Sequence, residues 1–557
     1  MVLAKEVADI QEWLKTHRIP WAEFLGLYVC AGTLHTFSKI LISSLRVRRM
    51  RRMLEDVPLA SYKDPDGLLG FAKDLRNNIK RDKDWWNEAS KGRPLSKFLG
   101  LKWESTQIAL VVRDPLLIKH FLKDSYEKYT RDSPQRNVFA YFLREWIGDG
   151  IFILQHGVGA PDNGKAWLVQ RKIASNIFSK ANFQTNMNEV FVSKGKRFCE
   201  LLEVAAKSGE PVNMQKMFFG FTMDSITKIF FGQEADTLAD STHPYGDAYD
   251  TAHRAMSDYV RPSMAKLLLM KYLPWPFGGV GGLAWYLHGL ISPEMWQFKK
   301  AVRTLDKESR KFIASARSDP ELSKRKDLLA LFIQAEEKES FSATYLRDMV
   351  LNFVIAGRDT TACTLSWLFY VLSINPEVQR KLQEEIDAKL PDGEAPTFKA
   401  VSARNMPYLN GVVYEVLRLY PPVPVDGKTC QEDDVFPDGT KVPKGTLCMW
   451  QPYAMGRDAN IYPDPMVVKP ERWIPFEAPS PHEFPVFQAG PRICLGMDMA
   501  QFEAKIATIM LLQKFSFTLK PGEEDKIHYS NTLTMSVCNS KNQDSHDLWL
   551  IPHNRLG

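Results

Sequence analysis

The chain has 557 residues, of which 45% are hydrophobic and 25% charged, a balance typical of a globular protein with a large core. Its 72 basic and 66 acidic residues leave a net charge of +6, which is too small to indicate a nucleic-acid partner. The seven cysteines have no paired spacing, which favours a reducing compartment over a disulfide framework. No Gly/Ser-rich or Pro-rich linker follows residue 60, so we expect one large, mainly α-helical domain over residues 61–557.

The N-terminal region combines an apolar stretch, residues 24–45, with a cluster of arginines at positions 46, 48, 49, 51 and 52. Its 22 residues are long enough to span a bilayer, and the arginines would then face the cytoplasm. His35 and Lys39 interrupt the stretch, so an interfacial helix or a soluble amphipathic helix are alternatives. We expect residues 1–60 to be a membrane-attachment segment and basic hinge, with the mode of attachment open. No cleavage site indicates a removable signal peptide.

Two features in the first half of the chain stand out. Trp167 and Arg171 are four residues apart, so they share one face of a predicted helix. An arginine stacked on a tryptophan is also a common structural pair. The stretch Tyr272–Ser292 is apolar but broken by four glycines, which makes it too irregular for a membrane span. It could dip into a bilayer, gate a channel or pack as a lid.

A long apolar helix without proline is predicted over Thr344–Ile374. In its middle, Ala356 and Gly357 are small enough to let a flat cofactor and dioxygen come close. Asp359 and Thr360 follow, an acid beside a hydroxyl, which together can relay protons to bound oxygen. The alternative is a plain helix with one glycine and a surface aspartate, although β-branched residues are unfavourable in the middle of a helix.

A second helix carries Glu415 and Arg418 three residues apart on one face, and the prolines after Tyr420 end it. An ion pair of this spacing at a protein surface contributes little to stability. Further on, Arg472 lies in the run Pro470–Trp473.

The stretch from residue 487 to 496 is the most informative part of the chain. Its pattern F-x-x-G-x-R-x-C-x-G is formed by Phe487, Gly490, Arg492, Cys494 and Gly496. The glycines permit tight turns and close approach, and the arginine is a permanent cation that can bind a carboxylate of a cofactor. The helix predicted over Met497–Leu512 places the cysteine at a helix N-terminus, where the dipole and a bound metal lower a thiol pKa.

This pattern resembles the haem-binding loop of the cytochrome P450 monooxygenases, and the resemblance extends over most of the chain. It implies a large helical domain with a small β-rich region, and a haem b whose iron is bound by Cys494. It assigns Trp167, Arg171 and Arg492 to the haem propionates, Ala356 and Gly357 to the oxygen groove, and Asp359 and Thr360 to proton delivery. It makes Glu415, Arg418 and Arg472 a structural network near the proximal side of the haem.

The resemblance places the walls of the substrate pocket in the predicted oxygen helix and in Arg131–Phe152, Met256–Leu290, Pro421–Asp426 and Asn531–Val537. The sequences of Ala356–Thr361, Asp434–Thr440 and Phe484–Gly490 are similar to those of the clan that hydroxylates the chain ends of fatty acids and alkanes. The most favoured function is therefore ω-hydroxylation of medium- or long-chain fatty acids or alkanes. Alternatives are a monooxygenase of sterols or other lipophilic substrates, a peroxide-driven or rearranging haem enzyme, and a haem-binding sensor or carrier.

The resemblance also implies partners and a location. We expect an NADPH-dependent flavin reductase as electron donor, with cytochrome b5 as a possible second donor, and no nucleic acid. We expect attachment to the endoplasmic reticulum membrane, with the catalytic domain on the cytoplasmic side.

Overall fold

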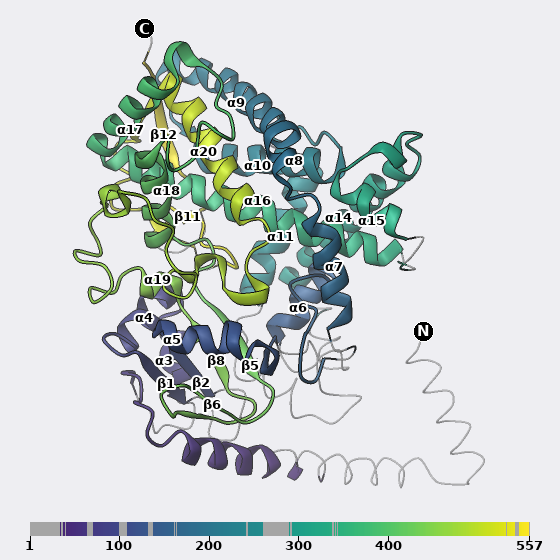
Figure 1. Ribbon diagram of the computed structural model, residues 1–557, viewed down its shortest axis with the longest axis vertical. Coiled ribbons are helices and arrows are strands. Elements are labelled where there is room, and N and C mark those ends of the chain that lie inside the picture. The colour runs from purple at the N-terminus through teal and green to yellow at the C-terminus, as the bar shows by residue number, and fades with distance from the viewer. Residues whose placement is uncertain are drawn as a thin grey trace.

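The computed structural model describes residues 34, 37–38, 41–63, 71–99, 108–131, 138–160, 162, 164–240, 243–259, 289, 292–336, 339, 341, 343–530, 532–540 and 545–555. Helices form most of this part; a five-stranded sheet lies below them in the view of Figure 1, whereas a three-stranded sheet lies beside helices near the top. This is the mainly α fold with a small β region that the sequence predicts. Most of the apolar stretch 24–45 and of Tyr272–Ser292 lies outside the described residues.

Sixteen α-helices are described within residues 71–514. They are α3 (Phe71–Asn77), α4 (Asp82–Ala89), α5 (Pro115–Lys119), α6 (Val138–Ile147), α7 (Lys165–Ser175), α8 (Lys180–Asn182), α9 (Asn188–Ser208), α10 (Met214–Phe231), α11 (Pro244–Tyr259), α14 (Pro293–Arg317), α15 (Leu328–Ala335), α16 (Ala343–Ile374), α17 (Pro376–Lys389), α18 (Pro407–Leu419), α19 (Pro452–Met455) and α20 (Met497–Lys514).

The strands form four small sheets. They are β1 (Leu95–Leu99), β2 (Ile108–Val112), β3 (Tyr129–Thr130), β4 (Val212–Asn213), β5 (Asp426–Cys430), β6 (Asp434–Val435), β7 (Lys441–Val442), β8 (Leu447–Trp450), β9 (Phe515–Leu519), β10 (His528–Tyr529), β11 (Val537–Cys538) and β12 (Trp549–Asn554). The largest sheet has the order β1-β2-β8-β5-β3, with β2 and β8 parallel and the other neighbours antiparallel.

The helix α16 is the centre of the helical body. It has 32 residues and confirms the long helix predicted from Thr344 to Ile374. Its length follows from an apolar run without proline, and it ends one residue before Asn375-Pro376, where the proline disfavours further helix. Large buried side chains such as Trp367 and Phe369 pack it into the main core. A cofactor site along α16 would therefore have a rigid wall.

Two further predicted helices are confirmed. Helix α18 ends at Leu419, directly before Tyr420 and the prolines that follow it. Helix α20 begins at Met497, three residues after Cys494, and continues two residues beyond the predicted end. Almost every residue of α20 from Met499 to Leu512 is buried, so this helix crosses the core and fixes the loop before it.

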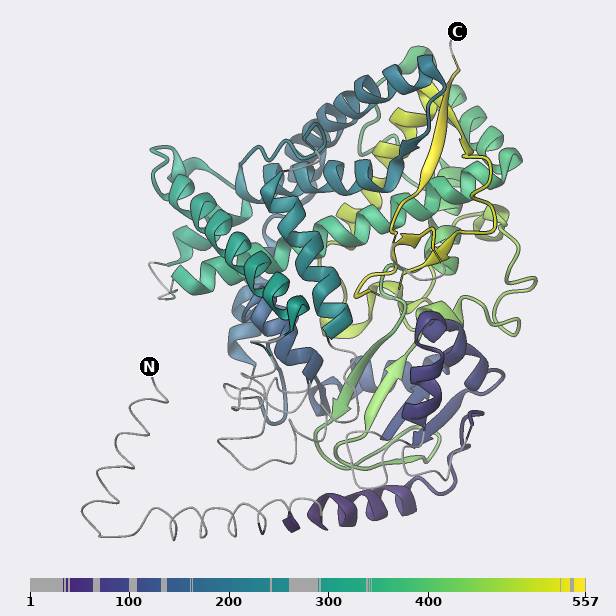
Figure 2. The ribbon, with the colours of Figure 1, turned by 180° about the vertical axis from the view of Figure 1, so that it is seen from behind.

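The N-terminal helix over residues 41–53 runs along the foot of the molecule, beside the five-stranded sheet (Figures 1 and 2). Its first turns expose Leu41, Ile42 and Leu45, whereas Val47 and Met50 are buried in the core of the sheet region. No helix within the described residues combines the length and the apolar character needed to cross a bilayer.

Candidate active site

The loop before α20 holds Cys494. The Cys494 N–H donates to the carbonyl of Phe487 at 2.8 Å, which closes the loop. Gly490 has a φ of +64°, and a Cβ there would collide with the carbonyl oxygen of Leu122, so this position requires glycine. At Gly496, the N-cap of α20, the nearest atom to such a Cβ among the described residues, chain neighbours aside, belongs to Phe178 at 3.8 Å. The two glycines of the motif thus meet different constraints.

The thiol of Cys494 is exposed, whereas the other five described cysteines are buried. It opens onto an internal cavity that this loop shares with α16. Burial within the protein raises the pKa of Cys494, opposed by the N–H of Gly496 and by the charge of Arg171. Without a bound metal, desolvation of the thiol therefore outweighs the groups that favour the thiolate.

The same cavity brings together most of the predicted site residues, although they lie far apart in the sequence. Its lining includes Ala356, Gly357 and Thr360 of α16, Phe487, Arg492, Cys494 and Gly496 of the loop, and Trp167 and Arg171 of α7. The missing side chain of Gly357 also makes room for Ile226 of α10, which a Cβ would strike. Gly357 therefore serves the packing of α10 on α16 in addition to bordering the cavity.

Two of the predicted cations are held by backbone carbonyls. Arg492 donates to Ile151 O at 3.1 Å and to Leu154 O at 2.7 Å, and its guanidinium lies 4.2 Å from the ring centre of Trp167. Arg171 donates to Ile493 O at 2.7 Å, one residue before the cysteine. Burial, with the nearby charges of two other arginines, lowers the pKa of Arg492 to about 9.

Sequence reasoning missed Lys428, a further cation of the cavity. Alternation along strand β5 places Asp426 and Lys428 on one side, and both line the cavity. Lys428 is 2% exposed, and its Nζ has no hydrogen-bond partner in the described part of the chain. Burial holds its pKa well below the usual range. The signal in the sequence was a lysine two residues after the predicted wall Pro421–Asp426.

These residues fit a haem. A buried cation without a partner is costly, and a carboxylate brought by a cofactor would satisfy it. Lys428 Nζ and Arg492 Nε both lack partners among the described residues and belong to the lining of the cavity. The cavity also offers an apolar surface from Phe230, Phe353 and other side chains, which suits a flat macrocycle.

Asp359 and Thr360 are neighbours in the chain but face different surroundings. Thr360 lines the cavity, and its hydroxyl donates to Ala356 O at 2.7 Å. Asp359 is fully buried and is not part of the cavity lining; Arg358 lies 2.9 Å from its Oδ1 and His253 3.2 Å from its Oδ2. Burial would raise the pKa of Asp359, but His253 and Arg358 lower it overall.

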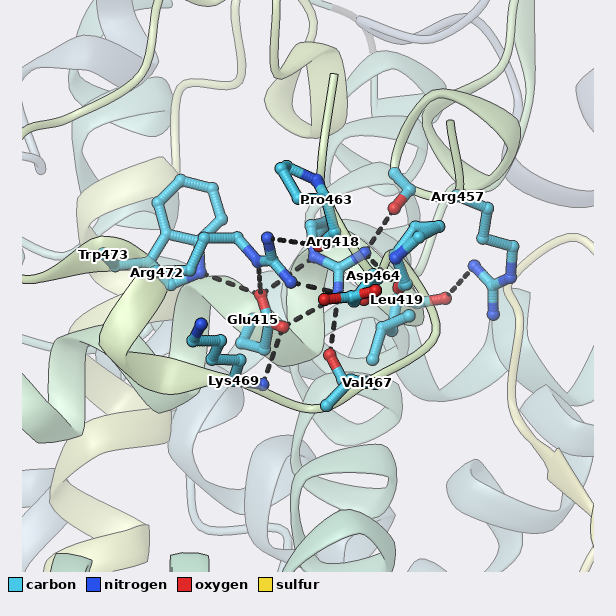
Figure 3. Close-up of polar contacts among 12 residues, drawn as sticks. Glu415, Arg418, Leu419, Arg457, Pro463, Asp464, Val467, Lys469, Arg472 and Trp473 are labelled. Carbon is cyan, nitrogen blue, oxygen red and sulfur yellow. Dashed lines mark hydrogen bonds and ion pairs between the residues drawn. The ribbon is translucent and has the colours of Figure 1, made fainter. Parts of the chain in front are cut away.

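A second buried network surrounds Glu415 (Figure 3). Arg418 donates to both Glu415 oxygens at 2.7 and 2.8 Å, and Arg472 lies 3.5 Å away. The Trp473 indole and the Lys469 backbone N–H also donate to this carboxylate, at 3.0 and 2.9 Å. Both side chains of the Glu415–Arg418 pair are completely buried, so the surface pair considered from the spacing is in fact an interior one.

Comparison with known proteins agrees with this arrangement. Residues 93–544 match the model of the Cytochrome P450 family. Cytochrome P450 86B1 of Arabidopsis thaliana is 33% identical over 458 residues, which cover 78% of this chain and 76% of the relative. Cytochrome P450 CYP94D108 of Paris polyphylla is 31% identical over 471 residues, 83% of this chain and 88% of the relative. Cytochrome P450 monooxygenase cyp1 of Mycosarcoma maydis is 31% identical over 435 residues, 73% of this chain and 62% of the relative. The chain therefore belongs to the cytochrome P450 family, the haem-thiolate monooxygenases, as its sequence predicts.

Proposed function

We propose that Cys494 is the thiolate ligand of the haem iron and that the enzyme hydroxylates a fatty acid or alkane at or beside its terminal methyl. The observation that carries the first part is the exposed Cys494 thiol in an apolar cavity that also contains Lys428, whose Nζ has no hydrogen-bond partner among the described residues. When bound, a haem with a thiolate ligand supplies dioxygen activation and O–O cleavage.

The residues of the cavity then have separate tasks. Arg492, Arg171, Trp167 and Lys428 would bind the haem carboxylates, because they supply charge and N–H donors to the lining of the cavity. Phe487, Gly490 and Gly496 shape the loop that presents the thiol. Ala356 and Gly357 leave space beside the helix for dioxygen.

Proton delivery falls to Thr360 and Asp359. The Thr360 hydroxyl lines the cavity and can hold a proton at its Oγ1, whereas the buried Asp359 carboxylate supplies the acid from the adjacent face of the helix. Glu415, Arg418 and Arg472 touch neither and have a structural role.

The choice of substrate rests on the resemblance of Ala356–Thr361, Asp434–Thr440 and Phe484–Gly490 to the chain-end hydroxylases, together with the apolar lining of the cavity. A primary C–H bond is stronger than the methylene bonds beside it. Selectivity for the chain end must therefore come from geometry, through a channel that keeps inner carbons away from the iron.

The family requires an electron donor and a lipophilic substrate; we propose an NADPH-dependent flavin reductase, with cytochrome b5 as a second donor. We propose that residues 1–60 attach the domain 61–557 to the cytoplasmic face of the endoplasmic reticulum. The exposed Leu41, Ile42 and Leu45, followed by arginines, suit a membrane surface with anionic headgroups.

Product analysis with purified enzyme, reductase and NADPH tests this proposal. We expect oxygenation at or next to the terminal carbon of medium or long fatty acids. Mainly mid-chain products, or turnover of sterols but not of fatty acids, would overturn the substrate assignment and leave the haem chemistry in place. NADPH consumption without any product across this panel would indicate that the protein is a haem carrier or sensor.

A further inference from the structure

His253 of α11 links two parts of the molecule that lie far apart in the sequence. Its Nδ1 lies 3.2 Å from Asp359 Oδ2 on α16. Its Nε2 accepts a hydrogen bond of 3.1 Å from the backbone N–H of Leu533, in the turn between β10 and β11. The imidazole is 7% exposed and packs against Trp146, with ring centres 5.6 Å apart.

These two contacts define the proton positions on the ring. A backbone N–H can only donate, so the Nε2 that receives it from Leu533 carries no proton. The neutral imidazole then has its one proton on Nδ1, the nitrogen that faces Asp359. His253 therefore presents a donor to the carboxylate as long as the Leu533 contact persists.

The opposite side of Asp359 is held by an arginine. Arg358 lies 2.9 Å from Asp359 Oδ1 and 2.7 Å from Asp250 Oδ1, and its guanidinium packs 4.6 Å from the ring of Phe219. Asp359 Oδ1 thus accepts a hydrogen bond from Arg358, whereas Oδ2 has the 3.2 Å ion-pair contact with His253 but no hydrogen bond of regular geometry among the described residues. Asp359 projects about 100° around the helix from Thr360. A rotation of the carboxylate toward the cavity would have to break the contact with His253 or with Arg358.

The Leu533 turn is itself fixed to the walls of the predicted substrate pocket. The Met535 N–H donates to Pro422 O at 2.9 Å, and the Trp367 indole donates to Met535 O at 2.7 Å. The turn therefore joins α16 and the segment after α18, and His253 adds α11 to this group. A substrate that displaces the turn would change the second contact of His253.

We propose that His253 is a positioning residue that holds the Asp359 carboxylate for proton delivery and couples it to the Leu533 turn of the substrate pocket. The inference rests on the proposed role of Asp359 and Thr360 in supplying protons. It differs from that role because it assigns the control of the acid to a residue that lies outside the cavity lining.

Two substitutions separate the two contacts. In His253→Asn, the amide nitrogen takes the place of Nδ1 and keeps a donor for Asp359, but the acceptor for Leu533 is lost. In His253→Gln, the longer amide reaches the place of Nε2 and keeps an acceptor for Leu533, but the donor for Asp359 is lost. Both are first checked for the ferrous–CO spectrum, which confirms the folded, haem-loaded enzyme.

We expect His253→Gln to lower product per NADPH by about fivefold or more, with the substrate-induced spectral shift retained, and His253→Asn to stay within about twofold. Hydrogen–deuterium exchange, which needs no turnover, should be faster over residues 532–536 in His253→Asn and unchanged in His253→Gln. Unchanged coupling in His253→Gln would overturn the inference. So would equal coupling losses in both variants with weakened substrate binding, because these indicate a packing role.

The Thr360→Ala variant separates this result from the proposed function. Full coupling in Thr360→Ala would remove the proton-delivery proposal, whatever the His253 variants do. Uncoupling in Thr360→Ala together with full coupling in His253→Gln would overturn only the role of His253.

Discussion

The structure contains two buried carboxylates with contrasting surroundings, Glu415 of α18 and Asp359 of α16. Glu415 has five contacts, from two arginines, an indole and a backbone N–H. The side chains of Glu415 and Arg418 are completely buried, and that of Arg472 is largely buried. Asp359 accepts one hydrogen bond, from Arg358 to Oδ1, and its Oδ2 has only the 3.2 Å ion-pair contact with His253 within the described residues. Arg358 also pairs with Asp250, whose side chain is 41% exposed. One network is closed, and the other reaches the surface.

This difference separates stability from function. Burying a charge costs free energy unless several hydrogen-bond donors compensate it, and a carboxylate held by many donors is fixed in position. The Glu415 network joins α18 to the loop of residues 456–473 and anchors that loop to the core (Figure 3). Asp359 has fewer donors than Glu415, which is the arrangement we expect of the group that we propose takes up and releases protons.

The largest effect should come from opening the closed network. Glu415→Gln leaves Arg418 buried without its counter-charge, so we expect a loss of about 3–5 kcal/mol in the free energy of unfolding, and little folded enzyme with haem. Chemical denaturation and the ferrous–CO spectrum measure both. The matched control is Glu471→Gln, a half-exposed carboxylate in the same region that pairs with Lys381 and should have little effect. Normal stability of Glu415→Gln would contradict the distinction between the two networks.

The next effect concerns the iron ligand and not the fold. We expect Cys494→Ser to lose the strongly red-shifted Soret band of the ferrous–CO complex, because a hydroxyl cannot replace the thiolate. The control is Cys199→Ser, at a buried cysteine outside the cavity lining, which should leave the band in place. If Cys494→Ser kept the band, another ligand would have to be sought.

An intermediate effect is expected from Thr360, the neighbour of Asp359 on α16. Thr360→Ala should bind haem and substrate but release peroxide, with product per NADPH reduced by an order of magnitude, because the cavity hydroxyl that holds the proton is gone. The control is Ser366→Ala on the same helix, whose buried hydroxyl donates to Ala362 O and does not line the cavity. Equal coupling in the two variants would remove Thr360 from the mechanism.

The smallest effect should come from Asp250, the exposed end of the Asp359 network. Asp250→Asn removes a half-exposed partner of Arg358 but leaves the Arg358–Asp359 pair, so we expect a change below about 1 kcal/mol in stability. Coupling should fall less than in Thr360→Ala. A loss of coupling as large as in Thr360→Ala would contradict the minor role expected for Asp250, the exposed end of the Asp359 network.

Much of the fold could be predicted because its signals are local. Apolar runs without proline predicted α16 and α20 to within two residues. The spacing of Glu415 and Arg418 indicated a shared helix face, but burial depends on what packs over that face. Their interior position could therefore not be derived from the spacing, which favours a surface pair.

The candidate site was predictable where a motif marked it and not where only tertiary contacts create it. Lys428 stands alone in a short strand, and its role in the cavity depends on the loop that carries Arg492. His253 contacts residues 106 and 280 positions away, and no spacing in the sequence relates them. The adjacency of Asp359 and Thr360 suggested a single surface, whereas the helix turns them toward different surroundings.

The two glycines of the cysteine loop carry a consequence for mutational tolerance. At position 490 every L-amino acid would strike the Leu122 carbonyl, so a saturation library should retain a single residue there. At position 496 the protein's own atoms leave room for at least a methyl group. The two glycines look equivalent in the motif, but the two positions should therefore tolerate different sets of amino acids. A library selected only for folding of the chain, without haem, would tell which of them the protein requires for itself.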